Sequence, residues 1–254
     1  MNNTEIKKEK LNVKIFTTKD EMGKAAAISV AEKLNVAIAE KGFANLILAT
    51  GASQFQFLEH LQQQSIDWRK ITVFHLDEYK GMPVTHPASF RKYLKERILG
   101  KVQPKQVHYL NGDEPDAEAE VLRYENLLKE HPIDIACIGI GENGHIAFND
   151  PPVADFNDPK LVKVVGLDEA CRKQQLGEGW FPTFDDVPTH ALSLTIPAIM
   201  HCKAICCVVP DERKAEAVFN TLNAEISTAC PATILRTHPD CILYLDEGSA
   251  SKLN

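Results

Sequence analysis

The sequence contains no apolar run that approaches the roughly 20 residues needed to span a membrane, and no block of lysine and arginine. Residues 1–10 are polar and mixed in charge, without the apolar core of a secretory signal. The 28 basic and 35 acidic residues give a formal net charge of -7. These features argue against membrane and nucleic-acid partners and predict a cytoplasmic protein, in which an anionic ligand needs a local basic or amide-rich pocket.

Cysteine is present, but its seven copies show no CxxC or zinc-like spacing. Cys206 and Cys207 lie within the apolar run 204–209, which is typical of a buried strand. We therefore expect reduced thiols in the core, with no disulfide and no metal site.

Short apolar runs alternate with amphipathic segments along most of the chain. The strand-like runs are 13–16, 44–49, 71–76, 133–138, 204–209 and 241–245. The helix-like segments, which have apolar residues at three- and four-residue intervals, are 19–41, 54–64, 89–99, 116–130 and 212–223. This alternation predicts an α/β fold built around a largely parallel sheet.

No linker rich in proline, serine or glycine divides the chain, so residues 1–254 are expected to form a single domain. The one unusual segment is 149–188, which five prolines interrupt. Long irregular segments beside a functional site often act as lids. This segment is therefore a candidate lid, with an ordinary solvated loop as the alternative.

A glycine-rich turn, 139–144, follows the buried run 133–138 and leads to a histidine. His145 is thereby expected at the carboxyl end of a strand, where open α/β sheets bind ligands. Histidine suits proton transfer near neutral pH, and Asn143 or Asp150 could fix its tautomer. The alternatives are an ordinary hydrogen-bonded histidine and a metal ligand, which is less favoured because no second histidine or cysteine stands at ligand spacing.

Two junctions between a strand and a helix are candidate anion sites. At the first, small residues that offer backbone N–H groups and hydroxyls follow the run 44–49; they are Thr50, Gly51, Ala52 and Ser53. An ordinary turn with Ser53 as N-cap explains this segment equally well. At the second, Arg213 and Lys214 lie in the first helical turn, where cations oppose the helix dipole unless an anion is near.

Two acids, Asp77 and Glu78, follow the run 71–76. Strand alternation should point their side chains in opposite directions. A carboxylate in this place can act as a general base if burial raises its pKa from about 3.9 toward the working pH. The alternative is that both acids simply cap a loop.

Five motifs resemble the glucosamine-6-phosphate deaminase/isomerase family, part of a 6-phosphogluconolactonase-like superfamily, in order and spacing. They are Ala-Thr-Gly-Ala-Ser (49–53), Leu-Asp-Glu-Tyr (76–79), His-Pro-Ala-Ser-Phe (86–90), Gly-Ile-Gly-Glu-Asn-Gly-His-Ile-Ala-Phe-Asn-Asp (139–150) and Lys214. The likeness covers nearly the whole chain, and Gly-His-Ile-Ala-Phe-Asn is its most specific part. It implies a modified Rossmann-like fold, with helices on both faces of a largely parallel sheet.

The resemblance also implies an activity, the conversion of glucosamine 6-phosphate to fructose 6-phosphate and ammonia without an organic cofactor. By position, Asp77 matches the family's base, which moves a proton from C2 to C1 of the opened sugar. His145 matches the residue that assists opening of the ring. Residues 50–53 match the phosphate turn, and Lys214 matches a phosphate-binding lysine.

Three features depart from the family pattern. The deaminases usually have aspartate where this chain has Asn143 and glutamate where it has Asp150, so the partners of the histidine differ by one charge and one methylene. A substrate-contacting arginine aligns near Gln175, and Arg172 is the candidate replacement as a phosphate-binding fork. The chain also lacks the carboxyl-terminal extension of hexameric, allosterically regulated relatives, which predicts a monomer or a small homo-oligomer.

Three alternatives to glucosamine 6-phosphate deamination stay open. An isomerase or deaminase for another amino-sugar phosphate, such as galactosamine 6-phosphate, would carry the same motifs. A 6-phosphogluconolactonase-like hydrolase would share the Gly-x-Gly-x-x-Gly-His turn, but segments 86–90 and 146–149 favour the deaminase branch. A non-catalytic sugar-phosphate sensor would keep the pocket and lose ring opening through Asn143.

Overall fold

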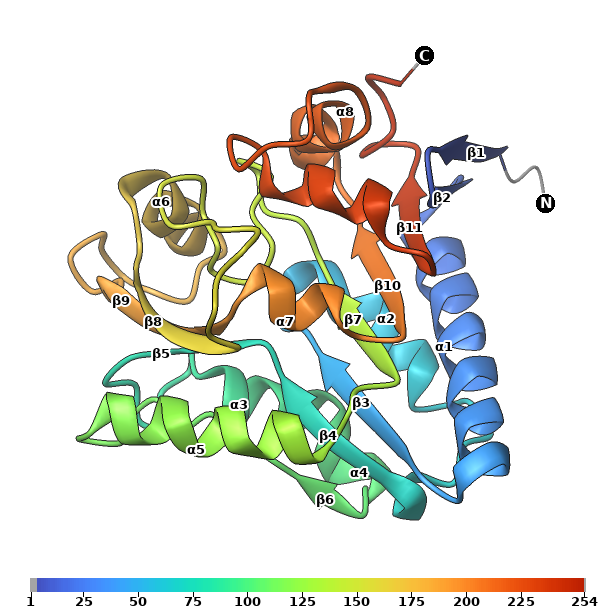
Figure 1. Ribbon diagram of the computed structural model, residues 1–254. Helices are drawn as coiled ribbons and strands as arrows, with labels where there is room; N and C mark the ends of the chain where they lie inside the picture. Colours follow the sequence, from blue (N-terminus) through green and yellow to red (C-terminus); the bar gives the residue numbers. More distant parts are fainter. Residues whose placement is uncertain (1–3, 254) are drawn as a thin grey trace.

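The computed structural model describes residues 4–253, in which the strands form two sheets (Figure 1). The larger sheet has the strand order β1-β2-β11-β10-β7-β3-β4-β6, and all neighbours except β1 and β2 pair in parallel. Its strands are β1 (Thr4–Lys8), β2 (Leu11–Phe16), β3 (Ala44–Leu48), β4 (Ile71–His75), β6 (Gln106–Val107), β7 (Ile135–Ile138), β10 (Ala204–Val209) and β11 (Cys241–Asp246).

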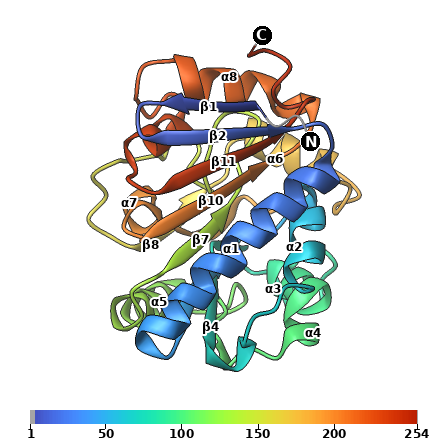
Figure 2. The same ribbon diagram turned by 90° about the vertical axis from the view of Figure 1, so that its right-hand side faces the viewer.

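Helices cover both faces of this sheet, and α1 crosses one face obliquely in Figure 2. The helices on that face are α1 (Lys19–Lys41), α2 (Phe55–Leu61) and α3 (Phe90–Leu94), which runs on through a π-helical turn (Lys95–Leu99) into α4 (Gly100–Val102). The helices on the other face are α5 (Ala117–Glu130), α7 (Ile196–Met200) and α8 (Ala215–Asn223). The predicted α/β architecture is thus confirmed.

The central strands are apolar along their whole length because both of their faces are buried. In β3, Leu46 and Leu48 pack in the core under α1, whereas Ile47 between them packs in the core under α5. The same alternation places Val73 and Phe74 of β4 in different cores. All seven cysteines are buried, in the core positions expected for them.

A second, antiparallel sheet lies beside the first and is absent from the sequence-based prediction. Its strands β5 (Asp77–Tyr79), β9 (His190–Leu194) and β8 (Val162–Gly166) pair in the order β5-β9-β8. A small aromatic core that includes Tyr79 and Phe181 packs against it. Segment 149–188 contributes both β8 and α6 (Glu169–Gly177), so the expectation that it is irregular throughout is wrong.

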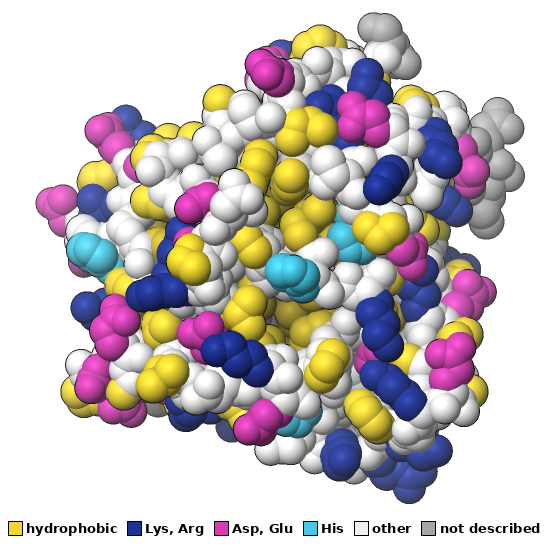
Figure 3. All heavy atoms as spheres, viewed as in Figure 1, with side chains coloured by type: hydrophobic (Ala, Val, Ile, Leu, Met, Phe, Trp, Pro, Cys, Tyr) yellow, Lys and Arg dark blue, Asp and Glu magenta, His cyan; other side chains and the backbone are white. Residues whose placement is uncertain are grey.

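Acidic and basic side chains are mixed over the face of the molecule shown in Figure 3, and hydrophobic side chains gather in a hollow near its centre. Across residues 4–253, the helices are all too short or too polar to cross a bilayer. Binding of an anion therefore depends on the local arrangement of a few groups rather than on a surface of one charge.

Candidate active site

The carboxyl ends of β3, β4, β7 and β10 meet around one cavity. The chain passes from β3 to β4 on one side of β3 and continues through β7 to β10 on the other, so the strand order reverses between β3 and β7. Open α/β sheets bind ligands at such a point. The cavity has a volume of about 630 Å³ including its open mouth, and is lined by Ala49, Thr50, Gly51, Ser53, Leu76, Asp77, Phe90, Gly139, Ile140, Gly141, His145, Ala147, Phe148, Gln174, Gln175, Glu178, Arg213 and Lys214.

The predicted small-residue turn forms one wall of this cavity. Thr50, Gly51 and Ser53 line the cavity directly, and Ala52 begins the short 3-10 turn that precedes α2. Gly51 has a φ of 94°, in the left-handed region that favours glycine. Tyr93 of α3 donates a hydrogen bond of 2.8 Å to the Gly51 carbonyl, which ties the turn to the helix.

Lys214 brings a buried positive charge to the same wall. It follows β10 in a 3-10 turn and is only 4 % exposed. Burial lowers the pKa of Lys214 to about 8, although the charges of Glu142 and Glu178 favour its protonated form. Across residues 4–253 it forms no ion pair, whereas its neighbour Arg213 lies 3.6 Å from Glu142. The ammonium group is therefore available to an anionic ligand.

Asp77 supplies a carboxyl group with an unusual pKa. Its side chain lines the cavity at the start of β5 and is 8 % exposed. Burial, and to a lesser extent the charge of Glu78, raises the pKa of Asp77 to about 8. A carboxylate with a pKa near the working pH is suited to accept a proton and return it.

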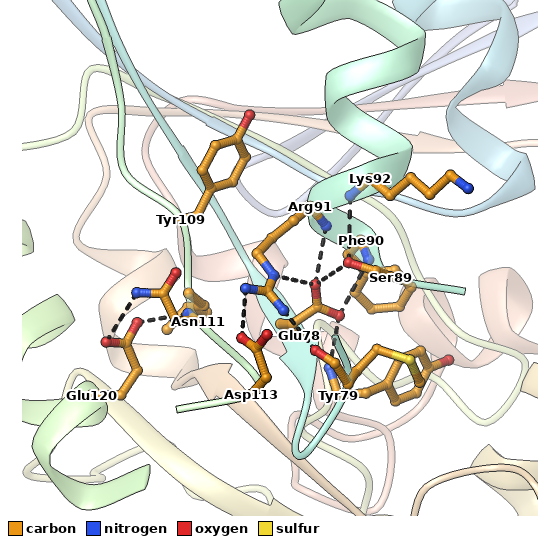
Figure 4. A network of polar contacts seen from close by, with 12 residues as sticks. Glu78, Tyr79, Ser89, Phe90, Arg91, Lys92, Tyr109, Asn111, Asp113 and Glu120 are labelled. Atoms are coloured by element: carbon orange, nitrogen blue, oxygen red, sulfur yellow. Dashed lines mark hydrogen bonds and ion pairs between the residues drawn. The ribbon is translucent and has the colours of Figure 1, made fainter. Parts of the chain in front are cut away.

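Glu78 points away from the cavity, toward α3 (Figure 4). Its carboxylate accepts hydrogen bonds from the Ser89 hydroxyl at 2.9 Å and from the Arg91 backbone N–H and Nε at 3.0 and 3.2 Å. Arg91 in turn bonds Asp113 at 2.8 Å. The expected opposite orientation of Asp77 and Glu78 is thus observed, and the buried Glu78 network fixes the strand that carries Asp77.

The glycine-rich turn after β7 holds His145 against the cavity. The imidazole packs so closely on Gly141 that a Cβ atom there would lie 2.1 Å from Cε1 of the ring. Nδ1 of His145 lies 2.8 Å from Oδ1 of Asp150, an ion-pair distance when the ring is protonated. The ring is therefore held between a glycine backbone and a buried carboxylate.

Asn143 bridges the two ends of this turn. Its amide nitrogen donates to Oδ1 of Asp150 at 2.8 Å, and its amide oxygen accepts from the His145 backbone N–H at 3.1 Å. Burial raises the pKa of Asp150, but the contacts of His145 and Asn143 outweigh it and leave this pKa below its usual value. Asp150 and Asn143 act on the cavity through His145, since neither lines it.

Helix α6 and the residue that follows it close the cavity with three side chains that the sequence did not predict there: Gln174, Gln175 and Glu178. The Gln174 side chain accepts a hydrogen bond of 2.9 Å from the Glu142 backbone N–H, and Gln175 accepts one of 2.6 Å from the Tyr79 hydroxyl. Their spacing on one helical face was the available signal, but no helix was predicted there.

Arg172 is not brought to the cavity. Its guanidinium donates to the carbonyls of Phe184 at 2.8 Å and Val187 at 2.9 Å, and it lies over the Phe184 ring. The guanidinium N–H groups that could bind a phosphate therefore bond the carbonyls of segment 183–187. The expected role of Arg172 as a phosphate fork therefore has no support in this geometry.

Comparison with known proteins identifies the relatives of the chain. Residues 17–243 match the family of glucosamine-6-phosphate isomerases and 6-phosphogluconolactonases. A glucosamine-6-phosphate deaminase of Listeria monocytogenes serotype 4a (strain HCC23) is 36% identical over 242 residues, which are 95% of this chain and all of that protein. A glucosamine-6-phosphate deaminase of Exiguobacterium sp. (strain ATCC BAA-1283 / AT1b) is 39% identical over 81% of this chain and 79% of its own length.

Solved structures agree in fold. A monomeric glucosamine-6-phosphate deaminase superposes with a TM-score of 0.85 at 32% identity, over 94% of this chain and 98% of that chain. A 6-phosphogluconolactonase from Shewanella baltica OS155 superposes with a TM-score of 0.76 at 19% identity, over 92% and 97% of the two chains, and shares the fold alone. By these matches, the chain belongs to the family of glucosamine-6-phosphate isomerases and 6-phosphogluconolactonases.

Proposed function

We propose that the protein converts glucosamine 6-phosphate to fructose 6-phosphate and ammonia. The single observation that carries the proposal is that Asp77, His145 and Lys214 line one cavity. A carboxyl group, an imidazole and a buried ammonium are the groups that proton transfer on a sugar phosphate requires. The two bacterial relatives described above, at 36% and 39% identity, are both glucosamine-6-phosphate deaminases, which supports the same substrate.

The phosphate of the sugar would bind between the small-residue turn and Lys214. Backbone N–H groups and hydroxyls of Thr50, Gly51, Ala52 and Ser53 would donate hydrogen bonds to its oxygens. A dianion beside Lys214 favours the protonated ammonium, so binding would raise the lysine pKa above its value of about 8 in the empty cavity. The sugar carbons would then extend toward Asp77 and His145.

His145 would catalyse opening of the sugar ring. The imidazole would take the proton of the hydroxyl on C1 and deliver a proton to the ring oxygen as the bond between that oxygen and C1 breaks. Asp150 lies 2.8 Å from Nδ1 and would stabilise the positive charge that the ring gains during this exchange. Asn143 would hold Asp150 in place through its 2.8 Å hydrogen bond.

Asp77 would catalyse the isomerisation. Its carboxylate would remove the proton from C2 of the open aldehyde, giving a cis-enolamine, and would return that proton to C1. The product is an imine at C2, to which water adds; ammonia then leaves and fructose 6-phosphate remains. The pKa of about 8 lets Asp77 exchange a proton in both directions near neutral pH.

The direct test measures ammonia release from glucosamine 6-phosphate and galactosamine 6-phosphate, with hydrolysis of 6-phosphogluconolactone as a parallel assay. The expected result is ammonia from glucosamine 6-phosphate, with deuterium from solvent D₂O at C1 of the fructose 6-phosphate in those turnovers in which the proton on Asp77 exchanges with solvent before its return. Release from galactosamine 6-phosphate alone would reassign the substrate. Tight binding of the sugar phosphate without turnover would replace the enzyme by a sensor.

We further propose that the protein acts as a monomer and that α6 is the moving part of segment 149–188. The relative of known structure that superposes at a TM-score of 0.85 is a monomeric enzyme, which supports the first proposal. Gln174 and Gln175 of α6 each form a single side-chain hydrogen bond across the cavity, with Glu142 and Tyr79, so that an opening of α6 breaks these two bonds, which supports the second. Light scattering and hydrogen exchange with and without substrate test the two proposals.

A further inference from the structure

His145, Asp150 and a thiol from α6 form a cluster behind the cavity wall. The imidazole nitrogen, a carboxylate oxygen and Sγ of Cys171 all lie within 4.8 Å of one another. The three residues are each more than nine-tenths buried, with Cys171 and Asp150 each 1 % exposed. Cys171 is distant from the other two in the sequence, so only the packing of α6 brings the thiol here.

Two polar atoms of this cluster are without hydrogen bonds in the region that the structure describes. They are Nδ1 of His145 and Oδ2 of Asp150. Nδ1 lies 2.8 Å from Oδ1 of Asp150, so the two side chains face each other at ion-pair distance. Buried polar atoms are almost always paired, so these two atoms point to an absent partner.

The three side chains offer one nitrogen, one oxygen and one sulfur ligand. Hard cations such as Mg²⁺ and Ca²⁺ prefer oxygen ligands, whereas Zn²⁺ binds histidine, cysteine and aspartate together. We propose that His145, Asp150 and Cys171 bind one Zn²⁺ ion, with a water molecule as the fourth ligand. The thiol loses its proton to solvent as the zinc–sulfur bond forms, and the two anionic ligands balance the charge of the ion.

The distances allow this site after a small adjustment. Zinc lies about 2.0–2.3 Å from such ligands, which places tetrahedral ligand atoms roughly 3.5 Å apart. The most separated atoms of the cluster, at up to 4.8 Å, must therefore approach by about 1 Å, which a change of the Cys171 side-chain rotamer can supply. His145 lines the cavity, so the ion reaches its ligands from the cavity side.

Zinc bound at this site would inhibit the proposed reaction. With Nδ1 bound to a metal, the imidazole cannot become protonated, and Asp150 is no longer free to stabilise its charge. Zinc should therefore act as a reversible inhibitor that chelators remove. This consequence rests on the proposed role of His145 in catalysis, whereas metal binding itself does not.

The test of binding uses chelator-treated protein and Co²⁺, whose thiolate complexes absorb in the near ultraviolet. The wild type should bind one equivalent with a sulfur-to-cobalt band, which Zn²⁺ displaces. Cys171→Ser should lose the band and weaken binding by roughly 100-fold. Cys230→Ala is the matched control, because Cys230 is another buried thiol that packs against the same glycine-rich turn, at Gly144.

Three results would overturn the site: no cobalt bound by the wild type, an unchanged band in Cys171→Ser, or equal loss of the band in Cys230→Ala. Asp150→Asn gives a second variant if Cys171→Ser does not fold, and it should also weaken binding. The activity assay separates the two proposals. If the wild type binds cobalt but the metal-free protein releases no ammonia, the proposed reaction is rejected and the site is kept, whereas ammonia release that zinc leaves unchanged would reject inhibition through His145.

Discussion

The imidazole of His145 rests directly on the backbone of Gly141, where a Cβ atom would lie 2.1 Å from Cε1 and 2.2 Å from Nε2. Gly141→Ala must therefore displace the ring. A shift of about 1 Å in a reacting group can lower the rate about 100-fold, and we expect a loss of that order in kcat for ammonia release.

The matched control for this substitution is Gly166→Ala. Gly166 lies at the end of β8, and a Cβ atom there meets nothing within 4 Å. Circular dichroism should show both variants folded, and only Gly141→Ala should lose activity. Full activity in Gly141→Ala would mean that the ring position does not limit the reaction.

Asp77→Asn should abolish turnover and stabilise the fold. The folded-state pKa of about 8 lies above the usual value near 3.9, so the folded protein holds more protons between these pH values and loses stability as the pH rises through them. The uncharged amide removes that loss, which should raise the free energy of unfolding at pH 8 by several kcal/mol.

Urea denaturation of both proteins at pH 5 and pH 8 measures this effect. The difference between variant and wild type should grow with pH, while calorimetry shows that the variant still binds the sugar phosphate. A variant that is no more stable than the wild type at pH 8 would show that Asp77 is not held at a raised pKa.

The pH dependence of kcat/KM should be bell-shaped with a maximum near pH 8. Its rising limb reports ionisation of Asp77 and its falling limb reports loss of the proton from Lys214, both with pKa values of about 8 in the free protein. Lys214→Arg should extend the falling limb to higher pH, because guanidinium stays charged. Lys214→Ala should mainly raise KM; an unchanged KM would remove Lys214 from the phosphate site.

Glu78→Gln should move the rising limb to lower pH. The charge of Glu78 helps to raise the pKa of Asp77, and the amide removes that charge. Asp113→Asn is the control, since Asp113 bonds the same Arg91 but is half exposed and turned away from the cavity. An identical limb in Glu78→Gln and the wild type would assign the raised pKa of Asp77 to burial alone.

Asn143→Asp should weaken the contact between His145 and Asp150. The amide nitrogen of Asn143 donates to Asp150 at 2.8 Å, and an aspartate would place a second carboxylate at that position. The two like charges should raise the pKa of Asp150, lower kcat several-fold near neutral pH and shift the pH profile. A profile that matches the wild type would show that a shared proton replaces the lost hydrogen bond.

The six inner strands of the larger sheet were predictable from the sequence because they are largely apolar and buried, and its long helices show apolar residues at three- and four-residue intervals. The edge strands β1 and β6 were not predicted, because their side chains are mostly exposed. The helix predicted over 19–41 coincides with α1, where Thr18 accepts a hydrogen bond from Glu21 and Gly42 ends the helix at a φ of 82°. The second sheet was missed because β5 has only three residues and pairs with a strand more than 100 residues away.

The residues around the cavity also divide into those that the sequence predicts and those that it does not. Asp77, His145 and Lys214 were predictable because each lies in the segment that follows a buried strand, and parallel strands end at one edge. The residues from α6 were not, since a helix flanked by loops can turn any face toward the site. Arg172 illustrates this limit: it lies only three residues from Gln175 and yet bonds Val187 instead of lining the cavity.

The pairing of β5 with β9 determines which way the two acids of β5 point. Asp77 lies opposite Ser193 and Glu78 opposite Leu192 in this pairing. A slip of one residue would exchange the two acids, since neighbouring side chains face opposite sides. Asp77 would then meet Arg91, and Glu78 would enter the cavity. The alignment of three residues thus determines which acid is available to a substrate, and Arg91 stabilises that choice by holding Glu78.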